Sequence, residues 1–289
     1  MHPSKEPGVH VQMSRASHML RITLCISATF AITAAGADAD IRPKITELTA
    51  EIYKEPNKSS SYLERGDLYR ALQNWDAAQA DFDFARQLDA KIEQIDFLQG
   101  RLFFEAGWPW SAKLSLDRFL RHQTNHVEAL VLRARTLTKL EDRAAAAADY
   151  TRAIQLTTES RPELYLERAQ CLAGAEGLLD AALKGLEEGI QRLGPLVTLE
   201  LGAIDIELKQ KRFDAALSRV DGILTKSARK ESLLARKAEI LQQAGRLDDA
   251  RASYRAALEA IESLPPARRN VPAMADLQKQ IHEKLDQLK

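Results

Sequence analysis

Cysteine is scarce in this sequence, which has only Cys25 and Cys171 in 289 residues. Cys25 lies in an apolar N-terminal run, so cleavage of that run would leave Cys171 alone. A lone cysteine excludes an intrachain disulfide framework. Cys171 has Ala169 and Leu172 as near neighbours, and we interpret it as a partly buried apolar side chain rather than a nucleophile.

An excess of charge of one sign is also lacking. The 41 lysines and arginines balance 41 aspartates and glutamates, so the formal net charge at pH 7 is zero. Proteins that bind nucleic acid usually carry a basic patch or stripe, so this balance argues against nucleic acid as a partner. The composition, 45% hydrophobic and 28% charged, is typical of a folded protein.

The usual signatures of catalysis are missing as well. The chain has no glycine-rich phosphate loop and no G-x-S-x-G nucleophile elbow. His122 and His126 have the i, i+4 spacing of metal-binding helices, but they fall where a helix is expected to end, and Glu128 is the nearest further ligand. We therefore expect no catalytic residue, no metal and no cofactor.

Residues 1–39 are typical of a secretory signal peptide. Positive charge precedes a mainly apolar run at 22–35, which is shorter than a typical membrane-spanning helix, and a small-x-small cleavage site ends at Ala39. We expect a periplasmic or secreted protein cleaved near Ala39. The alternative is an inner-membrane anchor, in which the uncleaved segment would be the membrane contact. Met13 and Met19 are alternative start positions.

A period of 34 or 35 residues organises the rest of the chain. Small residues recur at Gly66, Gly100, Ala134, Ala169, Ala203 or Ile204, and Ala238. A fixed period of this size indicates stacked repeats rather than one globular core. If Gly66 is position 8 of a unit, large residues fill positions 4, 11 and 24, and small ones fill positions 8, 20 and 27. These positions share one face on each of two successive helices.

The first unit follows this pattern at every position, with Tyr62, Gly66, Tyr69, Ala78, Phe82 and Ala85. The pattern resembles the tetratricopeptide repeat (TPR) family. The resemblance implies an all-α, right-handed superhelical solenoid of about six helix-turn-helix repeats over 59–263. The first helix of the fifth unit, around LELGAIDIEL, fits two registers.

Helical patterns flank the repeats. Apolar residues share one helical face over 41–53 and again over 274–288. We interpret 40–58 as an N-terminal capping helix with a linker and 264–289 as a C-terminal capping helix, because exposed solenoid ends need a polar outer face. Trp108 and Trp110 lie in the turn of the second repeat, and we interpret them as a local plug.

The resemblance also implies a function, because TPR proteins typically bind a peptide or a partner helix in the concave groove. Positions 5, 9 and 12 of each first helix face that groove in the family. In repeats one to three they are Leu63, Asp67, Arg70, Phe97, Arg101, Phe104, Val131, Arg135 and Thr138. Arginine and aromatic residues dominate interface energies, and arginine pairs well with carboxylates. We predict a non-catalytic envelope scaffold that binds a protein segment with an acidic and an apolar side chain.

Several alternatives stay open. Phe97 and Phe104 could instead pack against the neighbouring repeat, with Arg70 paired to Asp67 and Arg135 to Glu128. The protein could also be an oligomeric envelope component whose ends self-associate. The third alternative is an enzyme or a metal-dependent factor with its site in the inter-repeat loops.

Overall fold

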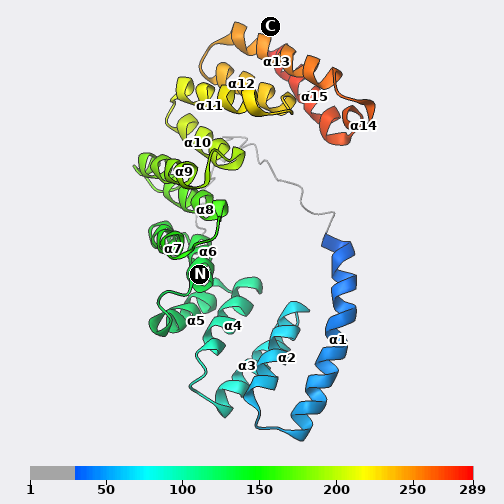
Figure 1. The fold of residues 1–289 in the computed structure, drawn as a ribbon, viewed down its shortest axis with the longest axis vertical. Helices are drawn as coiled ribbons and strands as arrows, with labels where there is room; N and C mark the ends of the chain where they lie inside the picture. Colours follow the sequence, from blue (N-terminus) through cyan, green and yellow to red (C-terminus); the bar gives the residue numbers. More distant parts are fainter. Residues whose placement is uncertain (1–29, 289) are drawn as a thin grey trace, which may run out of the picture.

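The computed structural model describes the backbone of residues 30–288, with side chains from residue 40 onward. Within this part the chain forms fifteen helices and no strand (Figure 1). The predicted signal peptide lies largely outside the described residues and stays a prediction. No helix in residues 30–288 is long and apolar enough to span a bilayer.

The predicted solenoid is confirmed, with six helix pairs stacked into an arc between two capping elements (Figure 1). From α4 to α9, the first helix of each pair lies on the inner side of the arc and the second helix outside it. The repeats are α2 (Ser59–Ala71) with α3 (Trp75–Leu88), α4 (Gln94–Glu105) with α5 (Pro109–His122), α6 (Val127–Lys139) with α7 (Arg143–Leu156), α8 (Pro162–Ala173) with α9 (Leu179–Leu193), α10 (Val197–Lys209) with α11 (Phe213–Lys226), and α12 (Glu231–Gln243) with α13 (Leu247–Glu262).

Small residues set the distance between the two helices of a repeat. A methyl group added at Gly66 would lie 2.7 Å from the Phe82 ring, and one at Gly100 would lie 2.7 Å from Leu116. Neither glycine therefore tolerates alanine without movement of its neighbour. The equivalent small residues Ala134 and Ala238 are fully buried. The predicted roles of position 8 as the narrow point and position 24 as the filling residue are confirmed.

A left-handed residue closes the turn inside each repeat and fixes the register of the fifth. The residue seven positions after position 8 has a positive φ in repeats one, two, three and six. In the fifth repeat this residue is Lys211, with a φ of 60°. Ile204, seven residues earlier, therefore occupies position 8, and both it and its neighbour Ala203 are fully buried.

This register places Glu200 and Glu207 at positions 4 and 11, where most other repeats carry large apolar residues. Both carboxylates bind one guanidinium: Arg219 donates from Nε to Glu207 at 2.8 Å and from Nη1 to Glu200 at 3.0 Å. Its Nη2 reaches Glu187 of the preceding repeat at 2.9 Å. Glu207 is 3% exposed, so a buried ionic cluster replaces the aromatic seam of the fifth repeat.

Two other repeats are held by a matching ion pair between their helices. Arg65 donates to both carboxylate oxygens of Asp81 at 2.8 and 2.7 Å. Arg133 binds Asp149 in the same two-pronged way at 2.7 and 2.8 Å. In each pair the two residues are 16 positions apart in the sequence, and the aspartate side chain is largely buried. Bidentate geometry of this kind stabilises a pair more than an ordinary surface contact does.

The N-terminal capping helix is longer than predicted. Helix α1 (Phe30–Lys54) begins well before residue 41, with Pro43 inside it. It packs along α2 through Leu48, which is buried. The Tyr62 hydroxyl of α2 donates a hydrogen bond of 3.0 Å to the Pro56 carbonyl in the loop that joins the two helices. The cap therefore rests on the first repeat, as expected.

At the other end, α15 (Pro272–Gln287) folds back on α13 and buries Ile281. A short separate helix, α14 (Pro266–Arg269), precedes α15 in the segment assigned to the C-terminal cap. The interpretation of the two tryptophans as a plug is wrong for Trp110, whose side chain is 71% exposed. Trp108 does contact Phe103, with ring centroids 5.9 Å apart.

The seam gives a stability prediction. Ala250 at position 20 of the sixth repeat is fully buried, so Ala250→Leu should overpack it and lower the free energy of unfolding by about 1–3 kcal/mol. Ala252→Leu, on the exposed face of the same helix, is the matched control. Chemical denaturation measures both. Equal stability of the two variants would show that the seam is placed wrongly.

Candidate partner-binding site

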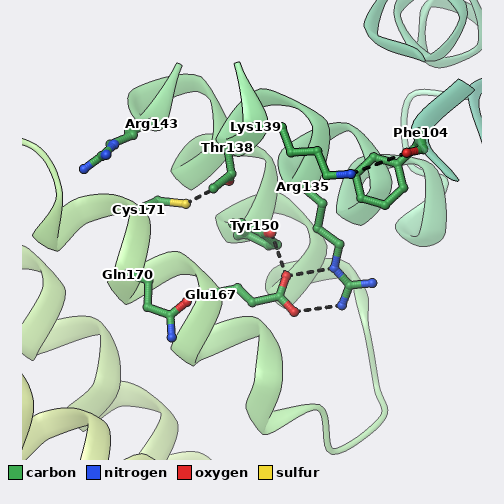
Figure 2. Close-up of a pocket in the computed structure, with 9 residues that line it drawn as sticks. All are labelled: Phe104, Arg135, Thr138, Lys139, Arg143, Tyr150, Glu167, Gln170 and Cys171. Carbon is green, nitrogen blue, oxygen red and sulfur yellow. Dashed lines mark hydrogen bonds and ion pairs between the residues drawn. The ribbon is translucent and has the colours of Figure 1, made fainter. Parts of the chain in front are cut away.

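A pocket of about 440 Å³ opens on the inner side of the arc, between α4, α6, α7 and α8 (Figure 2). Three of the residues predicted to face the groove line it: Phe104, Arg135 and Thr138. The other lining residues are Lys139, Arg143, Tyr150, Glu167, Gln170 and Cys171. The pocket therefore joins the second, third and fourth repeats.

Arg135 is held at this pocket by Glu167 from the next repeat. Its Nε and Nη2 donate to the two carboxylate oxygens at 2.9 and 2.8 Å, and the Tyr150 hydroxyl donates to the same carboxylate at 2.6 Å. Burial raises the pKa of Glu167, but the hydrogen bonds from Arg135 and Tyr150 outweigh it and lower that pKa below its usual value. The expected pairing of Arg135 with Glu128 is wrong, since Glu128 binds Arg161 instead.

Lys139 lies on the same side of the pocket as the Arg135 guanidinium (Figure 2). Its ammonium nitrogen is 4.0 Å from the centroid of the Phe104 ring and 3.4 Å from the Phe104 carbonyl oxygen. Arg143 lies on the far side, against Gly174 at the end of α8. A cation is favourable there, because the last carbonyls of a helix carry partial negative charge.

Cys171 forms part of the pocket wall and is buried. Its sulfur lies 3.2 Å from the Thr138 hydroxyl oxygen. Burial raises the pKa of the thiol, so it stays protonated near neutral pH. A protonated, buried thiol is a poor nucleophile, which agrees with the interpretation of Cys171 as a packing residue.

The first repeat's predicted contacts are already occupied within the chain. Arg70 donates to Asp67 at 2.7 Å and to Glu105 of the next repeat at 2.8 and 2.6 Å. Arg101 approaches Asp67 at 3.7 Å. The predicted pairing of Arg70 with Asp67 is therefore present, and neither arginine faces the groove unpaired. Leu63 is half-buried against the apolar cluster of the first two repeats.

Two further predictions need correction. Val131 is 1% exposed and belongs to the core, so it cannot touch a partner. Phe97 packs against Phe119 and His126 at centroid distances of 5.3 and 5.0 Å, as in the alternative that placed it against the neighbouring repeat. Phe104 alone of the two phenylalanines lines the pocket.

His126 has a structural role. Its Nδ1 accepts a hydrogen bond from the Ala129 amide at 3.2 Å and caps the start of α6. In the described residues no group of histidine, cysteine and acidic side chains could hold a metal ion. His122 points toward Glu93, with Nδ1 3.9 Å from a carboxylate oxygen.

Lys139 and Glu167 were missed because the pattern used positions 5, 9 and 12 alone. Lys139 follows Thr138 directly and occupies position 13, at the end of its helix. Glu167 lies 32 residues after Arg135, nearly one full period. Opposite charges separated by about one repeat are the sequence signal that could have found this pair.

Family models agree with the repeat pattern. One tetratricopeptide repeat model matches residues 127–159, the third repeat, and another matches residues 201–265, which cover most of the fifth and sixth repeats. The chain is a tetratricopeptide repeat protein. No curated protein sequence matches it.

Solved structures of other TPR proteins resemble the chain. The C-terminal part of a TPR protein from Cytophaga hutchinsonii has a TM-score of 0.63 at 14% identity, over 84% of this chain and 98% of that one. YrrB, a TPR protein with an unusual peptide-binding site, scores 0.53 at 21% identity, over 62% and 91%. PilW, a type IV pilus biogenesis factor, scores 0.52 at 18% identity, over 67% and 90%. At these identities the likeness establishes the fold.

The pocket gives a prediction of pH dependence. The folded pKa of Glu167 is lowered, so its contribution to stability is present above the usual glutamate pKa of about 4.3 and is lost as the pH falls through the folded value. At neutral pH, Glu167→Gln should lower the free energy of unfolding by about 1–3 kcal/mol. The difference between variant and parent should shrink in acid.

Glu163→Gln is the matched control on the same helix, because Glu163 is more exposed and pairs with Arg161 at 3.1 Å. Denaturation at several pH values measures all three proteins. A gap between Glu167→Gln and the parent that is constant with pH would contradict the assignment.

Proposed function

We propose that this TPR protein is a non-catalytic scaffold that binds a segment of a protein partner on the inner face of its solenoid, at the pocket between repeats two and four. The TPR repeats and the TPR structures that resemble the chain support an interaction scaffold. The observation that carries the proposal is the pocket itself, which combines an aromatic ring, fixed hydrogen-bonding groups and an open side. Most binding sites combine an apolar surface with a few well-placed polar groups.

The chemistry of the pocket favours binding over catalysis. Its one thiol is buried and protonated, and its one carboxylate is ion-paired with Arg135 and accepts a further hydrogen bond from Tyr150. A general base or nucleophile would need an available lone pair near an open space. The site offers hydrogen-bond donors and an apolar ring instead, which suit a peptide side chain.

The place of action follows from the sequence rather than from the fold. The apolar run, the cleavage site near Ala39 and the positive charge before them support export to the periplasm or secretion. The structural likeness to PilW, a pilus biogenesis factor, is compatible with an envelope role for this chain.

N-terminal sequencing of exported protein should find a mature chain that begins near Asp40, and an intact N-terminus would favour the anchor.

A photo-cross-linking experiment tests the binding face. A photoreactive amino acid replaces the exposed Gln170, which lines the pocket, or the exposed Lys184, which lies on α9 of the same repeat, outside the arc. Irradiation in cells should give a product with another protein from the Gln170 position and not from Lys184. Products of equal yield from both positions, or from Lys184 alone, would overturn the proposal. A product of the chain with itself would favour the oligomeric alternative.

A further inference from the structure

The charge balance of the pocket is uneven, although the whole chain is neutral. Three cations line it, Arg135, Lys139 and Arg143, against one carboxylate, Glu167. Glu167 is fully engaged by Arg135 and Tyr150. Among residues 40–288, no carboxylate lies within ion-pair distance of Lys139. The pocket therefore presents positive charge that the described chain does not compensate.

Arg135 can still donate to a second anion. Its two bonds to Glu167 use Nε and Nη2, and Figure 2 shows the remaining nitrogen turned away from that carboxylate. The side chain is 41% exposed, so this outer edge is open to the inner face of the arc. Because Glu167, itself held by Tyr150, already fixes the guanidinium, a ligand would lose little entropy in ordering it.

Lys139 supplies the second donor and Phe104 an apolar neighbour. The ammonium lies over the Phe104 ring and uses at most one of its three protons, on the Phe104 carbonyl oxygen. Both residues line the same pocket as the Arg135 pair, with the Lys139 ammonium and the guanidinium on the same side of it in Figure 2. The two donors and the ring fit a carboxylate that is followed closely by an apolar group.

We infer that this pocket recognises an acidic side chain of the partner segment, Asp or Glu, held between Lys139 and the outer edge of Arg135, with an adjacent apolar residue on Phe104. The inference rests on the proposed function and names the chemistry of its partner. It also changes the cations named in the sequence hypothesis. Arg70 is paired with Asp67 and Glu105, and Arg101 with Asp67, whereas Lys139 has no carboxylate partner among the described residues.

The test uses a random peptide library displayed as N-terminal fusions on phage, so that no peptide has a free C-terminal carboxylate. Selection on the full chain should enrich peptides with Asp or Glu next to a large apolar residue. The most enriched peptide is then synthesised with an amidated C-terminus. Lys139→Gln should weaken its binding by about five- to tenfold. Added salt should weaken its binding to the parent protein.

Lys209→Gln is the matched control, because Lys209 is the exposed last residue of α10 at the same position of the fifth repeat. It should bind the peptide as the parent does. Replacing the peptide's acid by its amide should weaken binding to the parent at least as much as Lys139→Gln does, and the two changes together should weaken it little more than the amide replacement alone. Thermal melting checks that each variant is folded.

The outcomes separate the two proposals. Enriched peptides that lack an acidic residue, or that bind Lys139→Gln as tightly as the parent, would overturn the acidic recognition and leave the groove function standing. A synthetic peptide with a free C-terminal carboxylate and no acidic side chain that binds more tightly than the amidated acidic peptide would assign the site to chain ends instead of side chains and would also overturn the inference. No enrichment, together with no cross-link from the Gln170 position, would overturn both.

Discussion

The close contact between the two helices of each repeat is the constraint on which the rest of this structure depends. At Gly66 and Gly100 the helices approach so closely that an added methyl group would lie 2.7 Å from the facing Phe82 or Leu116. The contact uses one face of the first helix and one face of the second. The remaining face of each first helix is then left to the inner side of the arc, where Arg135 and Thr138 reach the pocket. The proposed binding surface is thus a consequence of the seam.

Ion pairs take over where the apolar seam is weak. In the fifth repeat, Glu200 and Glu207 stand where large apolar residues are usual, and Arg219 binds both. Buried charges are costly to desolvate, so the attraction within this cluster is largely offset and its net contribution to stability is small. Its reach to Glu187 in the fourth repeat also ties neighbouring repeats together.

The sequence predicted the fold because the period and the seam pattern are local and repeated. It left the fifth register open because Ala203 and Ile204 are both apolar, and the two glutamates hide the pattern on either side of them. The left-handed turn at Lys211 settles this in the structure, but a lysine gives no sign of a positive φ, whereas a glycine such as Gly107 or Gly245 does.

The candidate site was harder to predict, for a different physical reason. A pattern shows which face an arginine occupies but not whether a carboxylate from another repeat already neutralises it. The pair of Arg70 with Asp67 could be predicted, because the two residues are three positions apart. By contrast, Arg70 and Glu105 are 35 positions apart, and Arg135 and Glu167 are 32 apart.

What marks a candidate binding cation in this solenoid is therefore a donor that no internal carboxylate uses, and not its residue type. Arginines dominate the internal pairs because their planar donors bind carboxylates two at a time. Lys139 is held by a ring and a single carbonyl oxygen, which leaves its ammonium able to exchange those contacts for a carboxylate. Arg135 contributes only the edge that Glu167 does not use. A fixed arginine edge beside a long lysine side chain that no carboxylate holds could orient an acidic side chain and still adapt to its length, which neither residue could do alone.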